Sequence, residues 1–252
     1  MSKDFYDKHK NFSYRTSAEY FISPGIRCKF DLLKLNLDSK RNFKKGIDLG
    51  CSGNSLLCFL DNISHKFFYD IASPPLRQYI NGKNTHPLCG DAIQLPFQDE
   101  TFDFLCALDV LEHIKHDEFA VSEMSRILKK NALVAITVPH RMKFYTNQDQ
   151  LIGHYRRYEI SRIISLFEKF NLKHLKNFGV YGRIMKVAEI QSTSPEGTEK
   201  KILKLRHRYE NNHTFRKIWN LVVKFLSKLM KLDVKYLSLK KVMNIAFIFK
   251  KD

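Results

Sequence analysis

The sequence predicts an α/β protein with a mostly parallel sheet covered by helices on both faces. Short apolar runs that are typical of buried strands alternate with helical runs along most of the 252 residues. The first apolar run enters a glycine-rich turn, and the next two runs each end in a carboxylate. This alternation favours parallel strands that are joined by helical crossovers.

Five apolar runs predict the strands in the first part of the chain. They lie at residues 45–50, 65–71, 86–90, 102–108 and 133–139. The segments between and after them predict helices near 54–62, 74–81, 116–130 and 158–170. Residues 172–180 predict a sixth strand, and 242–249 predict a seventh near the C-terminus.

The predicted organisation has four parts. They are an N-terminal helical cap, a core, a basic helical insert and a final strand of the core sheet, at residues 1–44, 45–183, 184–240 and 241–252. The insert opens with a Ser-, Thr-, Pro- and Gly-rich stretch, which is typical of a connection between elements. The cap could cover a ligand pocket, or it could be a simple packing layer.

Composition limits the class of protein. Apolar residues make up 44% of the chain and charged residues 27%, which fits one sizeable folded core. The five cysteines include no CxxC pair, so we expect reduced, mostly buried thiols without disulfides or structural zinc. The start of the chain lacks the apolar core of a signal peptide, and no run reaches the length of a membrane span. We therefore expect a cytoplasmic protein, or one peripheral on the inner membrane surface.

The net charge of +17 is concentrated towards the C-terminus, where the insert predicts a basic amphipathic helix. Apolar residues recur at steps of three and four from Phe215 to Met230, and lysines lie mostly on the opposite side. Such a helix can contact an anionic membrane surface, which we expect for residues 215–235, or cover an apolar substrate. The alternatives are packing on its own domain or a second subunit, and nucleic acid is the less favoured partner.

The segment GIDLGCSGN at residues 46–54 is the most informative motif. It reads as a buried strand that enters a sharp turn, where small residues let a ligand lie against main-chain N–H groups. A second strand ends in Asp70 about twenty residues later, where a carboxylate can accept hydrogen bonds from a ribose diol.

Several segments in order resemble the class I S-adenosylmethionine-dependent methyltransferases, of the methyltransferase type 11-like group. Besides the loop and the strand FFYDI, they are SPPL at 73–76, GDAIQLPF at 90–97, TFDFLCALDVLEHI at 101–114, SEMSRILKKNALVAITVPH at 122–140 and GHYRRYE at 153–159. The resemblance covers roughly residues 40–170. It implies a Rossmann-like sheet of seven strands with an antiparallel last strand, and methyl transfer from S-adenosyl-L-methionine.

The resemblance also implies which residues hold this cofactor. Asp70 would bind the ribose hydroxyls, Asp91 the adenine amino group, and Ala92 or Ile93 would flank the ring. The full assigned set is Asp48, Gly50, Cys51, Ser52, Asp70, Ile71, Asp91, Ala92, Ile93 and Leu108. The family commonly has DxGxGxG, and this chain has Ser52 and Asn54 at the later glycines. Because Asn tolerates left-handed backbone geometry, we still expect the loop to form.

Candidate bases follow the fourth strand. Methyl transfer from a sulfonium can rest on proximity and desolvation, with a base where the acceptor is a hydroxyl or amine. Asp109, Glu112 and His113 have the i, i+3, i+4 spacing that one helical turn would place on one face. We assign catalysis to Glu112, His113 and His154.

Acceptor binding is assigned to Asp109, His140, Arg157 and Tyr158. Arginine forks match carboxylate or phosphate, although Arg156 and Arg157 could instead pair with acids of the following helix. The VLEH run is similar to that of ubiquinone-type O-methyltransferases and RNA 3′-end methyltransferases, some of which hold a divalent cation with two acids and two histidines. Asp109, Glu112, His113 and His154 could supply such a set, but we assign no metal.

These observations predict a methyltransferase that acts on a small-molecule, lipid-linked or glycan acceptor. One alternative is an RNA methyltransferase, with or without a metal, which the positive charge supports. Another is a catalytically inactive binding protein that keeps the fold, which the irregular loop at Ser52–Asn54 supports.

Overall fold

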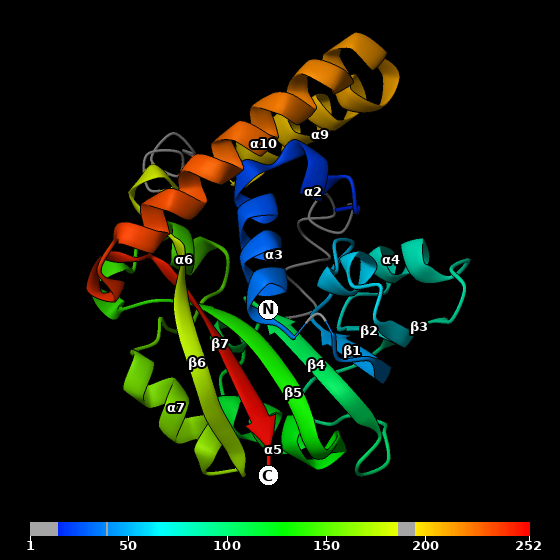
Figure 1. Cartoon of the computed structure of the whole chain (residues 1–252), viewed down its shortest axis with the longest axis vertical. Helices are drawn as coiled ribbons and strands as arrows, with labels where there is room; N and C mark the ends of the chain where they lie inside the picture. Colours follow the sequence, from blue (N-terminus) through cyan, green and yellow to red (C-terminus); the bar gives the residue numbers. More distant parts are fainter. Residues whose placement is uncertain (1–14, 39, 186–194) are drawn as a thin grey trace.

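A seven-stranded sheet forms the centre of the computed structural model (Figure 1). The structure describes residues 15–38, 40–185 and 195–252. The strand order is β3-β2-β1-β4-β5-β7-β6. Strands β1 to β5 are parallel, and β7 runs antiparallel to both of its neighbours. The predicted Rossmann-like sheet, mostly parallel with an antiparallel last strand, is confirmed.

The strands lie close to the predicted runs. Their bounds are β1 (Phe43–Leu49), β2 (Ile63–Asp70), β3 (Thr85–Cys89), β4 (Phe102–Leu108), β5 (Leu128–Pro139), β6 (Leu172–Tyr181) and β7 (Asn244–Lys251). Strand β5 differs most from the prediction because Leu128 already pairs with Phe102, before a register shift in the ladder.

Helices cover both faces of the sheet. On one face, α5 (Asp117–Ile127) and α7 (Ile160–Glu168) bury their apolar sides against alternate strand residues. On the other face lie α3 (Pro24–Asn36), the short α4 (Ser73–Leu76) and the 3-10 turn Leu56–Phe59. The two cores use opposite faces of the same strands because successive strand side chains alternate.

Two predicted helices are wrong in extent. In place of a helix over 54–62, the chain makes only the 3-10 turn Leu56–Phe59, because Ser55 caps it and the chain closes at Leu60 before β2 begins. In place of a helix over 74–81, α4 is followed by a second short turn, Arg77–Tyr79. Both short turns leave the carboxyl ends of β1 and β2 open to a ligand.

The described part of the predicted cap consists of α2 (Glu19–Ile22) and α3. The Ser23 hydroxyl accepts the Ile26 N–H, and Pro24 begins α3, so this helix has a well-defined start. Residues 1–14 lie outside the described part of the chain. Helix α3 lies between the sheet and the insert (Figure 1).

The predicted basic insert is a hairpin of α9 (Pro195–Asn211) and α10 (His213–Tyr236), which extends beyond the sheet (Figure 1). Part of the predicted connection, residues 186–194, lies outside the described residues. Helix α10 packs on α3 and β6 and buries Val223, Ser227, Met230 and Val234. No helix in the described ranges is long and apolar enough to cross a membrane.

The remaining elements are α6 (Asn147–Leu151) and the 3-10 turns Leu111–His113, Met142–Phe144 and Leu239–Lys241.

Candidate active site

A cavity of about 570 Å³ opens at the carboxyl ends of the parallel strands. All ten residues assigned to the cofactor line it, and Glu112, His113 and His154 line it as well. Its walls come from the loops after β1, β2, β3 and β4, from α3 and from the segment around α6. The parallel strand order brings these loops together, because their carboxyl ends meet at one edge of the sheet.

The loop after β1 has the tight geometry that its glycine requires. Gly50 has φ +70, and a Cβ on it would lie 2.5 Å from Cγ2 of Val110. The Gly50 N–H donates to the Tyr69 carbonyl at 2.8 Å, which ties the loop to β2. Ser52 is the other residue of this loop with left-handed geometry, at φ 49. The expectation that Asn54 takes that role is therefore wrong.

Asn54 has a different role in the structure. It lines the cavity, and its side-chain Oδ1 is buried without a hydrogen-bond partner in the described part of the chain. A buried acceptor without a partner is costly, so a donor group of a ligand would satisfy it. Asn54 was missed as a contact residue because the sequence motif indicated only a backbone role.

Asp70 is held in place at the end of β2. The Ser52 N–H donates to its Oδ2 at 2.8 Å, and the Ala72 N–H donates to its Oδ1 at 2.9 Å. Burial raises the pKa of this carboxyl. Each carboxylate oxygen has a further lone pair, so Asp70 can also accept from ribose hydroxyls, as its position after the second strand predicts.

The residues that the sequence assigns to adenine lie after β3. The exposed Asp91 accepts the Ile93 N–H at 3.1 Å, which shapes a turn that presents Ala92 and Ile93 to the cavity. Asp48 lies deeper and accepts the Ser55 hydroxyl, and burial raises the pKa of Asp48 to about 7. These positions fit the cofactor roles that the sequence assigns.

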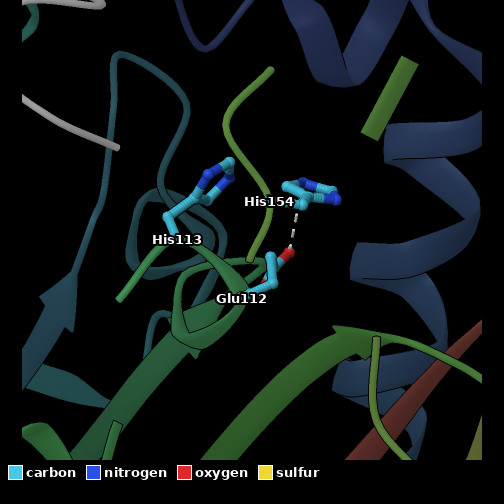
Figure 2. Close-up of side chains that lie close together, drawn as sticks. All are labelled: Glu112, His113 and His154. Atoms are coloured by element: carbon cyan, nitrogen blue, oxygen red, sulfur yellow. Dashed lines mark ion pairs between the residues drawn. The ribbon is translucent and has the colours of Figure 1, made fainter. Parts of the chain in front are cut away.

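Glu112, His113 and His154 form a cluster at one side of the cavity (Figure 2). One ligand-type atom from each lies within 4.8 Å of the others. Glu112 and His113 belong to the 3-10 turn after β4, and His154 follows α6. Its Nε2 lies 3.9 Å from Glu112 Oε1.

Burial dominates the electrostatics of this cluster. Glu112 is fully buried, and neither carboxylate oxygen has a hydrogen-bond partner in the described ranges. Burial raises the pKa of Glu112 well above its usual value and lowers the pKa of His113 to about 3. An imidazole that is neutral at physiological pH can accept a proton or bind a cation.

Asp149 organises His154 and Arg157. Its Oδ1 lies 2.7 Å from His154 Nδ1, and Arg157 donates to both oxygens, from Nε at 3.0 Å and from Nη2 at 2.8 Å. Burial alone would raise the pKa of Asp149, but the hydrogen bonds from His154 and Arg157 outweigh it and hold the pKa well below its usual range. Sequence reasoning missed Asp149, although the spacing of an acid five residues before a histidine was visible.

The comparisons with known proteins agree with this geometry. Residues 47–136 match the family model of a methyltransferase domain, which spans β1 to β5 and most of the cavity loops. This part of the chain matches a methyltransferase domain, and the sheet around it has the fold of the class I S-adenosylmethionine-dependent methyltransferases. Solved methyltransferases of this fold hold S-adenosyl-L-methionine or S-adenosyl-L-homocysteine, which is consistent with S-adenosyl-L-methionine as the cofactor.

Relatives of the methyltransferase are distant. An uncharacterized protein of Methanocaldococcus jannaschii is 28% identical over 169 residues, which are 66% of this chain and 68% of the relative. The N-methyltransferase NodS of Bradyrhizobium japonicum, solved with S-adenosyl-L-homocysteine, is 12% identical, and the match covers 99% of each chain with a TM-score of 0.62. Phosphoethanolamine N-methyltransferase 2 of Haemonchus contortus, solved with S-adenosyl-L-methionine, is 18% identical with a TM-score of 0.62, and the match covers all of this chain and 60% of that one.

Asp109 of the methyltransferase lines the cavity, but its carboxylate is already engaged. Lys29 Nζ lies 2.7 Å from Oδ2, and Oδ1 accepts from Thr137 at 2.8 Å and from Asn244 at 2.7 Å. Asp109 has φ +57, so it precedes the 3-10 turn and does not belong to it. The prediction that one helical turn presents Asp109 together with Glu112 and His113 is wrong for Asp109. Its assignment to acceptor binding stays a prediction, although both carboxylate oxygens already have partners within the protein.

His140 and Tyr158 are also corrected, because neither lines the cavity. Both are buried, and His140 Nδ1 lies 2.8 Å from the Tyr158 carbonyl. The Tyr158 hydroxyl donates to Asp117 Oδ2 at 2.9 Å and lies 3.0 Å from the Leu111 carbonyl. The polar groups of both side chains are therefore used in packing next to the site and do not reach the cavity.

The arginines of the GHYRRYE segment pair within the protein, as one of the two interpretations predicted, but with other acids. Arg157 lines the cavity and binds Asp149, so it is not available as a free fork for an anionic acceptor. Arg156 pairs with Asp117 at 2.8 Å. Within the described residues neither pairs with Glu159 or Glu168, and Glu159 pairs instead with Arg141 at 3.4 Å.

Proposed function

We propose that the methyltransferase acts on a small-molecule, lipid-linked or glycan acceptor whose nucleophilic atom lies beside Glu112 and His154. The observation that carries this proposal is the buried Glu112 carboxyl group, which has no hydrogen-bond partner in the described residues and lies in the same cavity as the cofactor residues. A hydroxyl or amine of an acceptor would satisfy it.

The hydrogen-bond network gives His154 a defined role. If Asp149 accepts the Nδ1 proton, as the 2.7 Å distance favours, the lone pair on Nε2 faces Glu112 and the cavity. That nitrogen can take the proton of the acceptor as the new bond to the methyl group forms. The Asp149 carboxylate beside Nδ1 then stabilises the positive imidazolium.

The cofactor supplies an electrophilic methyl group on a sulfonium, and its leaving group is neutral. The residues of the chain therefore need to hold the acceptor in line, exclude water and remove one proton. Asp70 and the loop at Gly50 fix one partner, and the cluster at Glu112 fixes the other. The small-molecule enzymes among the similar folds, such as the phosphoethanolamine N-methyltransferase, support an acceptor of this size.

The test is transfer of labelled methyl groups from S-adenosyl-L-methionine into lipid, glycan, small-molecule and RNA fractions of a cell extract. We expect label outside the RNA fraction, and a loss of at least about 100-fold with Glu112→Gln. Glu118→Gln, the same change at an exposed position of α5, is the control. Label that enters RNA alone, or equal label with both variants, would contradict the proposal.

A divalent cation at the cluster is a second candidate feature, and the donor set fits one. Glu112 offers a carboxylate without a partner in the described chain, and His154 is oriented through Nδ1 by Asp149, an arrangement common behind metal-binding histidines. His113 Nδ1 lies 3.3 Å from the Gly153 carbonyl, so its Nε2 is the candidate ligand atom. A cation there would polarise a hydroxyl acceptor and favour its loss of a proton.

The two candidates differ in a direct measurement. Metal analysis of purified protein, with and without Mg²⁺, Mn²⁺ or Zn²⁺, is compared between the wild type and His113→Asn. One bound cation that is lost in the variant would favour the metal-assisted reaction, including the RNA alternative. Full activity after treatment with a chelator would favour the proton-transfer role.

A further inference from the structure

Helix α10 has a second apolar side that nothing in the described chain covers. Val223, Met230 and Val234 face inward, whereas six large apolar side chains elsewhere on the helix are between 36% and 78% exposed. These six residues, which we call the outer stripe, are Ile218, Leu221, Phe225, Leu229, Leu232 and Tyr236. They recur at steps of three and four residues, so they lie along one side of the helix for ~27 Å.

This stripe differs from the single amphipathic face that the sequence predicts. The sequence pattern places the apolar residues from Phe215 to Met230 on one side, with lysines opposite. In the structure the helix is apolar on two sides, because the side that contains Val223 and Met230 is already buried against α3 and β6. On an ordinary surface the exposed apolar residues are scattered singly, whereas here six of them form a continuous row.

Four exposed lysines follow one edge of the outer stripe. Each directly precedes a stripe residue, so all four are rotated by the same angle from it and form one row. They are Lys217, Lys224, Lys228 and Lys235. None of them forms a salt bridge within the described ranges, whereas Lys231 on the inner side pairs with Asp31 at 2.8 Å. The single acid of α10, Asp233, accepts the Ile184 N–H.

We infer that the outer stripe seats this protein on an anionic lipid bilayer, with α10 parallel to the membrane plane. The apolar side chains enter the boundary between headgroups and acyl chains, and the lysine row contacts acidic headgroups. The inference concerns a surface outside the catalytic cavity and does not depend on the proposed acceptor. It also gives the positive charge of the insert a function.

Charge decides between this partner and two others. A nucleic acid would bind the lysine row but leave six apolar side chains in water. A second copy packed antiparallel on the stripe would bring the two lysine rows to the same side, where like charges repel. An anionic bilayer is the partner that satisfies both the apolar stripe and the row of cations.

The C-terminal end of the stripe fits the same partner. A shallow depression there is lined by the stripe residues Leu232 and Tyr236 together with Arg183 and Lys241. Asp233 also lines it, with its carboxylate engaged by the Ile184 N–H. Two cations beside exposed apolar side chains match a phosphate headgroup next to its acyl chains.

The experiment is co-sedimentation of the whole chain with vesicles, without S-adenosyl-L-methionine. Vesicles of phosphatidylcholine alone are compared with vesicles that contain about one third phosphatidylglycerol. We expect binding to the anionic vesicles that weakens by about fivefold for each lysine removed in Lys224→Gln and Lys228→Gln. The double variant Leu221→Gln/Phe225→Gln is expected to lose binding by at least tenfold.

Matched controls carry the same chemical changes elsewhere on the surface. Lys173→Gln/Lys176→Gln removes two exposed lysines of β6, and Ile80→Gln/Phe119→Gln replaces two exposed apolar residues. Both controls should bind like the wild type. Equal binding by stripe and control variants would overturn the inference. So would a dimer that dissociates in Leu221→Gln/Phe225→Gln without any vesicle binding, or RNA binding that depends on Lys224 while vesicle binding is absent.

Discussion

Lys29 Nζ lies 2.7 Å from Oδ2 of Asp109, and this ion pair fastens α3 to the end of β4 beside the cofactor cavity. The two residues are 80 positions apart in the chain. Asp109 is also bonded to Thr137 of β5 and Asn244 of β7, so one carboxylate joins a helix to three neighbouring strands. Helix α3 is therefore part of the wall of the site.

Replacing Lys29 by Met should destabilise the protein by about 3 kcal/mol, because it leaves a largely buried carboxylate without its cation. Burial alone would raise the pKa of Asp109, but Lys29, with the hydrogen bonds from Asn244 and Thr137, outweighs it and lowers the pKa to about 2. Urea unfolding at pH 7 measures the loss. Lys169→Met, which removes an exposed pair with Glu118, is the control and should change stability by less than about 1 kcal/mol. If both variants lose the same unfolding free energy, the pair of Lys29 with Asp109 stabilises the protein no more than an exposed pair does.

Asp48 predicts a pH dependence of stability. Burial raises its pKa to about 7, whereas an Asp in an unfolded chain titrates near ~3.9. Between these values the folded chain holds a proton that the unfolded chain has released. The stability that this group contributes is therefore fully present below about pH 4 and is lost as the pH rises to about 7.

The variant Asp48→Asn keeps the shape and does not titrate. The unfolding free energy of this variant minus that of the wild type should therefore increase as the pH rises from 4 to 7, by up to about 1.4 kcal/mol per pH unit. Urea unfolding of the ligand-free protein at several pH values checks this. Asp91→Asn, the same substitution at an exposed position, is the control, and a slope equal to that of the control would refute the prediction.

Gly50 should not tolerate a side chain. The variant Gly50→Ala combines left-handed backbone strain with a Cβ only 2.5 Å from Val110, and should weaken S-adenosyl-L-methionine binding by at least tenfold in calorimetry. Gly153→Ala has φ +80 but meets no atom within 4 Å, so it should cost only about 1 kcal/mol in stability. If Gly50→Ala/Val110→Ala does not recover part of the binding, the close approach is not the cause.

The sheet could be predicted from the sequence because its strands are apolar runs with turns between them. Strand β4 was predicted with the observed bounds, since Phe102–Leu108 is buried along almost its whole length. The placement of Asp70 and Asp91 in one cavity was predictable too, because they lie where two neighbouring parallel strands end at the same edge of the sheet.

The acceptor side could not be predicted to the same degree. The carboxylate of Asp109 is taken by Lys29 and Asn244, which are distant in sequence, and only tertiary packing brings them together. The spacing of Asp109 and Glu112 fits a helical turn, but the left-handed backbone at Asp109 changes the direction of its side chain. The exposed apolar side of α10 could not be predicted from the sequence either. A helix with two apolar sides has a sequence pattern close to that of a helix with one broad apolar face.

Asp149 should act through His154 as a positioning residue. It accepts from Nδ1 of His154 and so directs Nε2 towards Glu112 and the cavity. With Asp149→Asn the side chain no longer carries the charge that stabilises an imidazolium, and its amide can present a donor in place of an acceptor. We expect kcat to fall by about 100-fold while the Kd for S-adenosyl-L-methionine changes by less than about threefold. Single-turnover transfer of a labelled methyl group and calorimetry measure the two quantities.

Arg157→Gln separates this role from simple support of the fold. It removes the fork that binds both Asp149 oxygens but leaves the pair of Asp149 with His154. If Asp149 mattered only as the partner of Arg157, the two variants would lose the same activity. We expect Arg157→Gln to lose much less activity than Asp149→Asn, and Asp149→Glu to recover part of the activity. Both active variants keep a carboxylate at position 149 that can accept the Nδ1 proton of His154. That result would show that Asp149 acts through His154.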